Sequence, residues 1–95
     1  MQKIKFYFRA SCPHSQLLLR SFKKNQVEFD LLDVASSPEF SEELKTVADG
    51  NLSVPTLLFP DGEIMIEPST FSSIRFVRKH YPELIKPKRK SWFHF

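Results

Sequence analysis

Cysteine is almost absent from this 95-residue chain, which contains a single thiol at Cys12. One thiol cannot form an intramolecular disulfide, so the chain is not a disulfide scaffold, and a structural zinc site built from several cysteines is excluded as well. A single cysteine is typical of a protein from a reducing compartment. Any redox chemistry at Cys12 must therefore pass through a mixed disulfide with another molecule.

Long hydrophobic runs are missing too. No stretch approaches the roughly 20 apolar residues that a membrane span needs. The N-terminal segment, residues 1–8, shows no apolar run followed by a small-residue cleavage site. We therefore expect a soluble, cytoplasmic protein without a membrane span. The chain also lacks repeats and internal linkers, and its length suits one domain with a modest core.

Acidic residues are missing from the C-terminal end, where positive charge collects. The net charge of the whole chain is +3, yet four of its 14 basic residues lie in residues 86–95. The remainder, with ten basic and eleven acidic side chains, is nearly neutral. The basic pI is therefore no argument for a nucleic-acid-binding domain, and we expect no nucleic-acid partner. We divide the chain into a folded domain, residues 1–85, and a flexible, basic and aromatic tail, residues 86–95.

The hydrophobic pattern predicts alternating strands and helices. Strands are expected at 3–8, 27–34, 54–59 and 63–67, and helices at 13–25, from 38 to about 47 and from about 70 to 81. The predicted inner face of the first helix is formed by Leu17, Leu18, Leu19 and Phe22. The last helix is expected to turn Phe71, Ile74, Phe76 and Val77 partly inward. The order β-α-β-α-β-β-α predicts an α/β fold with a four-stranded mixed sheet and flanking helices.

Cys12 follows the first predicted strand directly and precedes the first predicted helix. Pro13 suits the first turn of a helix, because its missing N–H costs nothing there and its φ is already helical. The sulfur would then face unpaired amide donors and the positive end of the helix dipole, which favour the thiolate. Arg9 adds a nearby cation. A lone cysteine can also be a small buried hydrophobe, but this context favours a reactive thiol.

The position three residues after Cys12, where a Cys-x-x-Cys motif has its resolving thiol, is occupied by Ser15. We interpret Ser15 mainly as a first-turn polar residue that helps to satisfy backbone donors. An engineered replacement of cysteine by serine would look the same in the sequence. His14 is interpreted as a solvated first-turn residue; covering the sulfur or raising its thiolate character is the alternative.

A cysteine after the first strand, in this order of elements, resembles the thioredoxin fold and, within it, the glutaredoxin family. Two motifs carry the resemblance: Cys12-Pro13-His14-Ser15, and Asn51-Leu52-Ser53-Val54-Pro55-Thr56 running on to Phe59-Pro60-Asp61-Gly62. The resemblance covers residues 3 to about 81. The second motif is most similar to the mycoredoxin-like and short bacterial glutaredoxins.

The resemblance implies a binding site for a small thiol beside Cys12. In the family, the proline that matches Pro55 is cis, and the backbone of the residue that matches Val54 pairs with the cysteinyl part of a bound tripeptide thiol. Arg9 matches a basic residue that can meet a ligand carboxylate. The positions that bind the γ-glutamyl end of the ligand match Ser69 and Thr70. A plain strand start at Pro55, and plain helix capping at Ser69 and Thr70, remain the alternatives.

The resemblance also implies the function, a glutaredoxin-like thiol-disulfide oxidoreductase acting by a monothiol mechanism. Its substrates would be glutathionylated or otherwise mixed-disulfide proteins, with glutathione or another low-molecular-weight thiol as co-substrate, and we expect a monomer without a metal. Many relatives carry Arg or Lys where this chain has Leu52, so one charge contact with glutathione is missing and a different small thiol is plausible.

Two alternatives belong to other classes. One is an iron–sulfur cluster-binding monothiol glutaredoxin, in which Cys12 and a bound thiol would hold a cluster between two subunits. Relatives of that kind usually carry Gly where this chain has Pro13. The other is a thioredoxin-fold binding domain with vestigial chemistry.

The tail itself carries Trp92, Phe93 and Phe95 beside its cations. Three interpretations stay open: a disordered solvated extension, an anchor for acidic membranes or nucleic acid, and an aromatic segment that folds back onto the domain or a second copy. Every matched site residue lies between Arg9 and Thr70. We therefore expect that truncation after Ile85 leaves the thiol chemistry intact.

Overall fold

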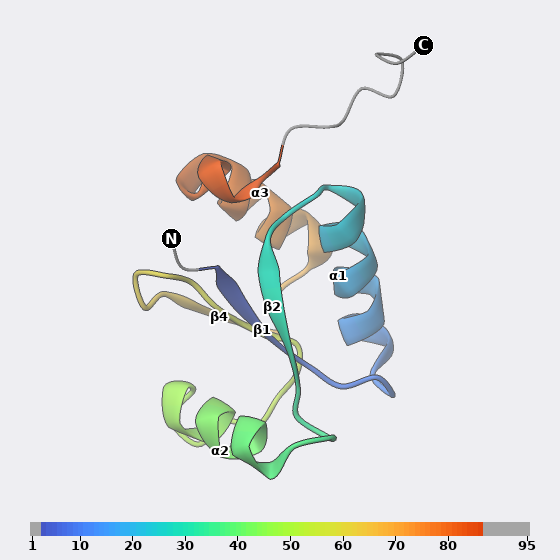
Figure 1. The fold of residues 1–95 in the computed structure, drawn as a ribbon, viewed down its shortest axis with the longest axis vertical. Helices are drawn as coiled ribbons and strands as arrows, with labels where there is room; N and C mark the ends of the chain where they lie inside the picture. The colour runs from blue at the N-terminus through green and yellow to red at the C-terminus, as the bar shows by residue number, and fades with distance from the viewer. Residues whose placement is uncertain (1–2, 87–95) are drawn as a thin grey trace.

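The computed structural model of the protein describes residues 3–86 (Figure 1). The elements are β1 (Ile4–Phe8), α1 (Pro13–Lys24), β2 (Phe29–Asp33), α2 (Pro38–Val47), β3 (Thr56–Leu58), β4 (Ile64–Ile66), α3 (Thr70–His80) and the 3₁₀ turn η1 (Pro82–Leu84). The predicted order of strands and helices is confirmed, and η1 is an addition that the sequence pattern did not predict. Residues 87–95 of the predicted tail lie outside the described residues.

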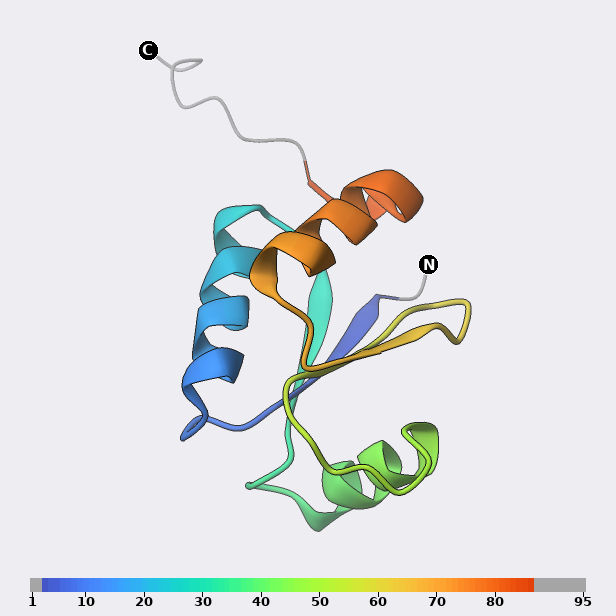
Figure 2. The ribbon, with the colours of Figure 1, turned by 180° about the vertical axis from the view of Figure 1, so that it is seen from behind.

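The four strands form one mixed sheet in the order β2-β1-β3-β4. β1 pairs with β2 in parallel and with β3 in antiparallel sense, and the β3–β4 hairpin adds a second antiparallel pair. The expected thioredoxin-like arrangement of a parallel unit joined to a hairpin is thus confirmed. Helices α1 and α3 lie on one face of this sheet and α2 on the other, as the front and back views show (Figures 1 and 2).

β1 supplies side chains to both layers of the core, because successive residues of a strand point to opposite faces. Ile4, Phe6 and Phe8 pack against α1 and α3, in the cluster that also holds Leu18 of α1. Tyr7 points to the other face, into the smaller cluster between the sheet and α2. The central strand is therefore almost wholly buried, which explains its nearly continuous apolar sequence.

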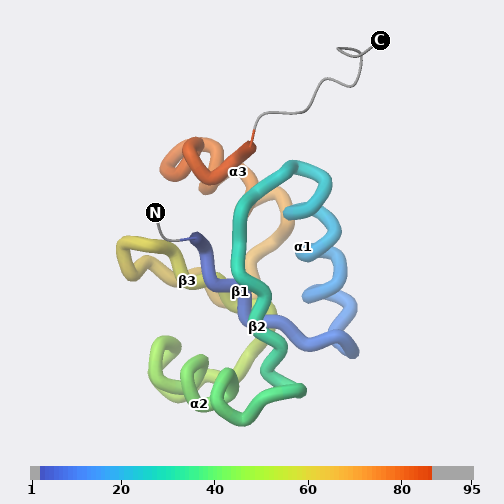
Figure 3. The backbone as a smooth tube through the Cα atoms, in the orientation of Figure 1, coloured from blue at the N-terminus to red at the C-terminus, as the bar shows by residue number. Residues whose placement is uncertain are grey.

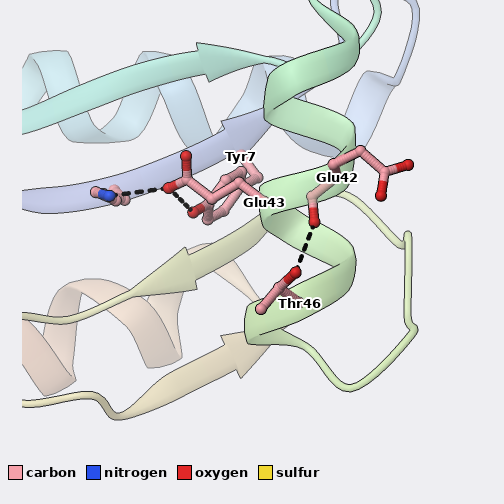
Figure 4. Close-up of polar contacts among 5 residues, drawn as sticks. Tyr7, Glu42, Glu43 and Thr46 are labelled. Atoms are coloured by element: carbon pink, nitrogen blue, oxygen red, sulfur yellow. Dashed lines mark hydrogen bonds and ion pairs between the residues drawn. The ribbon is translucent and has the colours of Figure 1, made fainter.

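Besides its apolar packing, helix α2 contacts the central strand through the carboxylate of Glu43. The Tyr7 hydroxyl donates to Oε2 of Glu43 at 2.6 Å, and the Lys5 ammonium lies 2.8 Å from the same oxygen (Figure 4). Because Tyr7 is fully buried, Glu43 satisfies a hydroxyl that has no access to water. Burial, followed by the bond to Glu43, raises the pKa of Tyr7 well above its ordinary value.

Helices α1 and α3 run in the same direction. Near their N-termini, Nε2 of His14 lies 2.7 Å from the Pro68 carbonyl oxygen, and at their C-termini the Arg78 guanidinium donates to the Asn25 side chain at 3.2 Å. The chain then returns to the end of α1, where the Lys86 N–H donates to the Gln26 carbonyl at 3.0 Å. Both helices thus begin at the Cys12 end and finish at the opposite end, a path that the backbone tube of Figure 3 follows.

Two predicted core residues are exposed instead. Leu17 is 55% exposed and Phe71 is 71% exposed, so their assignment to the inner faces of α1 and α3 was wrong. In a run of three leucines successive side chains are about 100° apart, and Leu18 occupies the buried stripe. Phe71 lies in the first turn of α3, where the Arg75 guanidinium carbon sits 5.9 Å from the centre of its ring.

Within residues 3–86, no helix has the length and apolar content required to cross a bilayer.

Candidate active site

Cys12 occupies the N-cap of α1, as the sequence predicts. A short turn after β1 places it there, with the Cys12 N–H donating to the Arg9 carbonyl at 3.0 Å. Pro13 is the first residue of the helix, and the Cys12 sulfur accepts a hydrogen bond from the Ser15 N–H at 3.4 Å. The sulfur thus takes the place of the side-chain oxygen of an ordinary N-cap and lies among the free amide donors of the first turn.

Ser15 has a different role from the one predicted. Its side chain is fully buried, and its hydroxyl satisfies no backbone donor. The N-cap bond is made instead by the sulfur of Cys12. The Ser15 hydroxyl therefore lies beside the sulfur without an oxygen or nitrogen partner of its own, and a thiolate is the acceptor that would satisfy it.

These neighbours lower the pKa of Cys12 below its ordinary value. The largest cause is the Ser15 side chain, followed by the Ser15 N–H, and the His14 N–H adds to the effect. Partial desolvation and the carboxylate of Glu67 act in the opposite direction. Donors fixed at the helix start stabilise the thiolate. A contribution from the exposed Arg9 cation stays a prediction.

The loop before β3 brings a carbonyl group to the sulfur. The peptide bond between Val54 and Pro55 is cis, as the family resemblance implies, and the Cys12 thiol donates to the Val54 carbonyl oxygen at 3.8 Å. Pro55 is buried, while Val54 is partly exposed. The hydroxyl of Thr56 bonds back to the Ser53 carbonyl at 2.8 Å and holds the turn. A strand-like edge of backbone thus lies next to the sulfur.

Glu67 is a site residue that the sequence does not predict. Its N–H donates to the Pro55 carbonyl at 2.7 Å, and its φ of 49° lies in the left-handed region. This bond joins the residue before Pro68 to the cis-proline loop and leaves the exposed carboxylate close enough to oppose the Cys12 thiolate. An acid just before a proline is also a common turn residue, so the sequence offered no signal for this contact.

His14 is partly buried and joins two loops of the site. Since the Pro68 carbonyl can only accept, the Nε2–H of His14 donates to it. The interpretation of His14 as a solvated first-turn residue was therefore wrong. This bond ties the start of α1 to the segment that leads into α3.

Ser69 caps α3, and the first residue of that helix is Thr70. The Ser69 hydroxyl accepts from the Ser72 N–H at 3.0 Å. The Arg9 side chain and Leu52 are both exposed. No three His, Cys, Asp or Glu side chains gather as a metal site among the described residues.

A single cysteine at a helix N-terminus, next to a cis-proline loop on a sheet of this order, defines a thiol-disulfide oxidoreductase of thioredoxin-like fold. The glutaredoxin family model matches residues 4–65. Mycoredoxin 1 of Corynebacterium glutamicum is 37% identical over 62 residues, which cover 65% of this chain and 76% of that protein. The chain belongs to the glutaredoxin family.

Solved structures agree on the fold. Glutaredoxin from Archaeoglobus fulgidus superposes with a TM-score of 0.69 at 19% identity, covering 82% of this chain and 88% of that one. Wheat glutaredoxin superposes with a TM-score of 0.58 at 13% identity, covering 84% of this chain and 74% of that one. A thioredoxin-like protein superposes with a TM-score of 0.68 at 24% identity, covering 80% of this chain and 99% of that one.

Proposed function

We propose that this glutaredoxin reduces mixed disulfides between proteins and a low-molecular-weight thiol by a monothiol mechanism. One observation carries the proposal: the only sulfur of the chain that can attack a disulfide lies at the start of α1, beside the buried Ser15 hydroxyl. Ser15 stands where a resolving cysteine would be, and it cannot form a disulfide. The same side chain thus excludes the dithiol route and supports the thiolate.

The reaction consists of two thiol-disulfide exchanges. The Cys12 thiolate attacks the small-thiol sulfur of the mixed disulfide, and a bond forms between these two sulfurs. The bond to the protein sulfur breaks, and the protein leaves as a thiolate that takes a proton from water. A second small-thiol anion then attacks the small-thiol sulfur on Cys12, which releases Cys12 as a thiolate and forms the disulfide of the small thiol.

Backbone groups are the best-placed ligands for the small thiol. The partly exposed backbone of Val54, just before the buried cis-proline, can pair with an extended peptide-like ligand next to the sulfur. Because the Ser69 hydroxyl already caps α3, the N–H groups at the start of this helix, including that of Thr70, remain for a ligand carboxylate. Arg9 is exposed and can meet a second carboxylate. We assign the enzyme to the reducing cytoplasm as a monomer.

The test is a mass measurement on the reduced protein after treatment with oxidised glutathione. We expect one glutathione on Cys12, its removal by free glutathione, and no adduct on Cys12→Ser. The protein should also turn over a glutathionylated peptide while leaving insulin disulfides intact, because a monothiol enzyme has no second sulfur to resolve a protein-bound intermediate. Absence of the adduct, or robust insulin reduction, would contradict the proposal.

A further inference from the structure

Glu67 has a backbone conformation that its place in the chain does not explain. Among residues 3–86, the non-glycine residues with positive φ are Gln26, Asp49 and Glu67, at 58°, 54° and 49°. Gln26 and Asp49 directly follow the caps that end α1 and α2, where a left-handed residue is common. Glu67 instead follows β4 and precedes Pro68, a position that favours extended backbone. Its conformation is therefore strained, and such strain is often found at functional sites.

Two hydrogen bonds hold this strained segment beside the thiol. The Glu67 N–H donates to the Pro55 carbonyl at 2.7 Å, and the carbonyl of the next residue, Pro68, accepts from Nε2 of His14 at 2.7 Å. Pro55 belongs to the loop whose Val54 carbonyl lies 3.8 Å from the sulfur, and His14 belongs to the first turn of α1. The backbone of Glu67 is thus fixed between the two segments that carry and flank the sulfur.

Within the described residues, the carboxylate of Glu67 forms no ion pair. Its side chain is exposed, and the ion pairs of residues 3–86 involve Glu28, Glu42 and Glu43 instead. The carboxylate nevertheless lies close enough to the sulfur to raise the pKa of Cys12, against the donors that lower it. An acid at this position therefore reduces the fraction of thiolate, and no cation of the described chain compensates for it.

A positive charge on the substrate would give this carboxylate a partner. When Cys12 attacks, its thiolate and the Glu67 carboxylate place two negative charges near each other. A cation next to the reacting sulfurs is attracted by both charges, whereas an anion is repelled by both. The approach is open, because Glu67 is exposed and Cys12 is partly exposed. The site should therefore distinguish disulfides by the charge that they carry.

We propose that Glu67 is a specificity-determining residue, whose carboxylate selects disulfides that carry a positive charge next to the sulfur–sulfur bond. The inference rests on the proposed function, because the selected disulfide is the one attacked in the first exchange. In that step the Cys12 thiolate forms a bond to the small-thiol sulfur, and the protein sulfur leaves with the electron pair of the broken bond. A lysine or arginine of the protein part, or an ammonium group of the small thiol, supplies the positive charge.

The first arm of the test measures the rate at which Cys12 forms an adduct with small symmetric disulfides. Cystamine is cationic, hydroxyethyl disulfide is neutral and dithiodipropionate is anionic, and mass spectrometry follows each reaction at one pH. We expect the native protein to favour cystamine over dithiodipropionate, less so as salt is added. Glu67→Gln should reduce the ratio of these two rates about fivefold, the scale of an exposed ion pair. Because each disulfide meets the same thiolate, this ratio does not depend on the pKa of Cys12.

Two further variants separate the carboxylate from the loop that carries it. Glu67→Gly removes the same charge and adopts a positive φ without strain, so it should lose the same selectivity in a folded protein. Glu63→Gln removes an exposed carboxylate at the other end of β4 and should leave the ratio unchanged. An unchanged ratio in Glu67→Gln would overturn the proposal. An equal loss in Glu63→Gln would also overturn it, since net charge would then decide the selectivity.

The second arm identifies which part of the substrate carries the cation. It uses mixed disulfides of neutral mercaptoethanol with two peptides that differ only in a lysine or a glutamate beside the cysteine. A lysine preference that falls in Glu67→Gln would assign the cation to the protein part. A preference that stays the same, with the cystamine effect retained, would assign it to the small thiol. If the proposed function failed, the peptides would not be turned over by catalytic amounts of the protein, yet the cystamine ratio would still respond to Glu67.

Discussion

At the residue scale, the reactivity of Cys12 depends on which neighbours meet the charge of its thiolate. The Ser15 hydroxyl and the N–H groups of Ser15 and His14 favour the charged form, and the Glu67 carboxylate opposes it. The first group belongs to one turn of helix α1, while Glu67 arrives from the segment between β4 and α3. The pKa of the sulfur therefore reports on both the local helix and the way in which distant loops assemble.

Substitutions of Ser15 and Glu67 should move the pKa of Cys12 in opposite directions. Ser15→Ala removes the largest stabilising contact and should raise the pKa, whereas Glu67→Gln removes the opposing charge and should lower it. The pH dependence of iodoacetamide alkylation measures both. Ser21→Ala, two turns further along α1, serves as the control. An unchanged profile in Ser15→Ala would show that the hydroxyl does not face the thiolate.

The ionisation of Cys12 also makes stability depend on pH. The pKa of Cys12 is lower in the folded protein than its ordinary value, so between these two values the unfolded chain binds more protons and stability rises with pH. The contribution is complete above the ordinary thiol pKa, roughly 8.5, and is lost as the pH falls through the folded value. Urea unfolding of the reduced protein, compared with Cys12→Ser from mildly acidic to mildly alkaline pH, should show this difference. A pH-independent difference would contradict it.

Leu52 is 48% exposed near the cis-proline loop and offers no charge to a ligand. We expect Leu52→Arg to tighten glutathione binding by about 1 kcal/mol, the scale of a partly exposed ion pair. Calorimetry with Cys12→Ser measures binding without the covalent step. Unchanged affinity would mean that the glycyl carboxylate of glutathione is held elsewhere or that another thiol is the natural ligand.

At the scale of the elements, we expect one substitution in α2 to lower the stability of the fold. Glu43→Ala leaves the buried Tyr7 hydroxyl without its partner and should lower the free energy of unfolding by about 1–3 kcal/mol. The side chain of the neighbouring Glu42 is exposed and, within residues 3–86, forms its ion pair with Lys45 at 3.6 Å. Glu42→Ala should therefore change stability by no more than about 0.5 kcal/mol.

Figure 4 shows why the two glutamates form a matched pair. The bond drawn between Thr46 and Glu42 involves the Glu42 backbone carbonyl, so it survives removal of that side chain. Equal destabilisation of the two variants in urea titrations would mean that helix propensity, and not the bond to Tyr7, decides the result. Burial of Tyr7 makes that outcome unexpected.

At the scale of the whole molecule, the thiol site lies where α1 begins, whereas the described chain finishes at Lys86, beside the end of the same helix. We therefore expect removal of residues 87–95 to leave the rate of deglutathionylation within a factor of about two. The cut is placed after Lys86, one residue later than the sequence suggested, because Lys86 bonds to Gln26 and Glu28. A tenfold loss of rate in a folded protein would place the tail at the active site.

The sequence by itself determined the order of the elements and the position of the reactive sulfur. Both depend on local physics: apolar periodicity separates strands from helices, and Pro13 specifies a helix start immediately after Cys12. The resemblance of two short motifs then indicated the family and the cis bond before Pro55. The exact ends of β2 and β3 and the turn η1 were not predicted, because pairing partners and not propensity set such boundaries.

Only the tertiary structure decided how the site is lined. Serine is a residue type that helix N-termini favour. The burial of Ser15 beside the sulfur follows instead from the packing of α1 on the sheet. The approach of Glu67 and the bond from His14 to Pro68 join residues more than 50 positions apart in the chain. Contacts of this kind leave no periodic trace in a sequence. They arise because three loops that connect different strands and helices meet at one end of the sheet. The groups that these loops carry there stabilise or destabilise the thiolate.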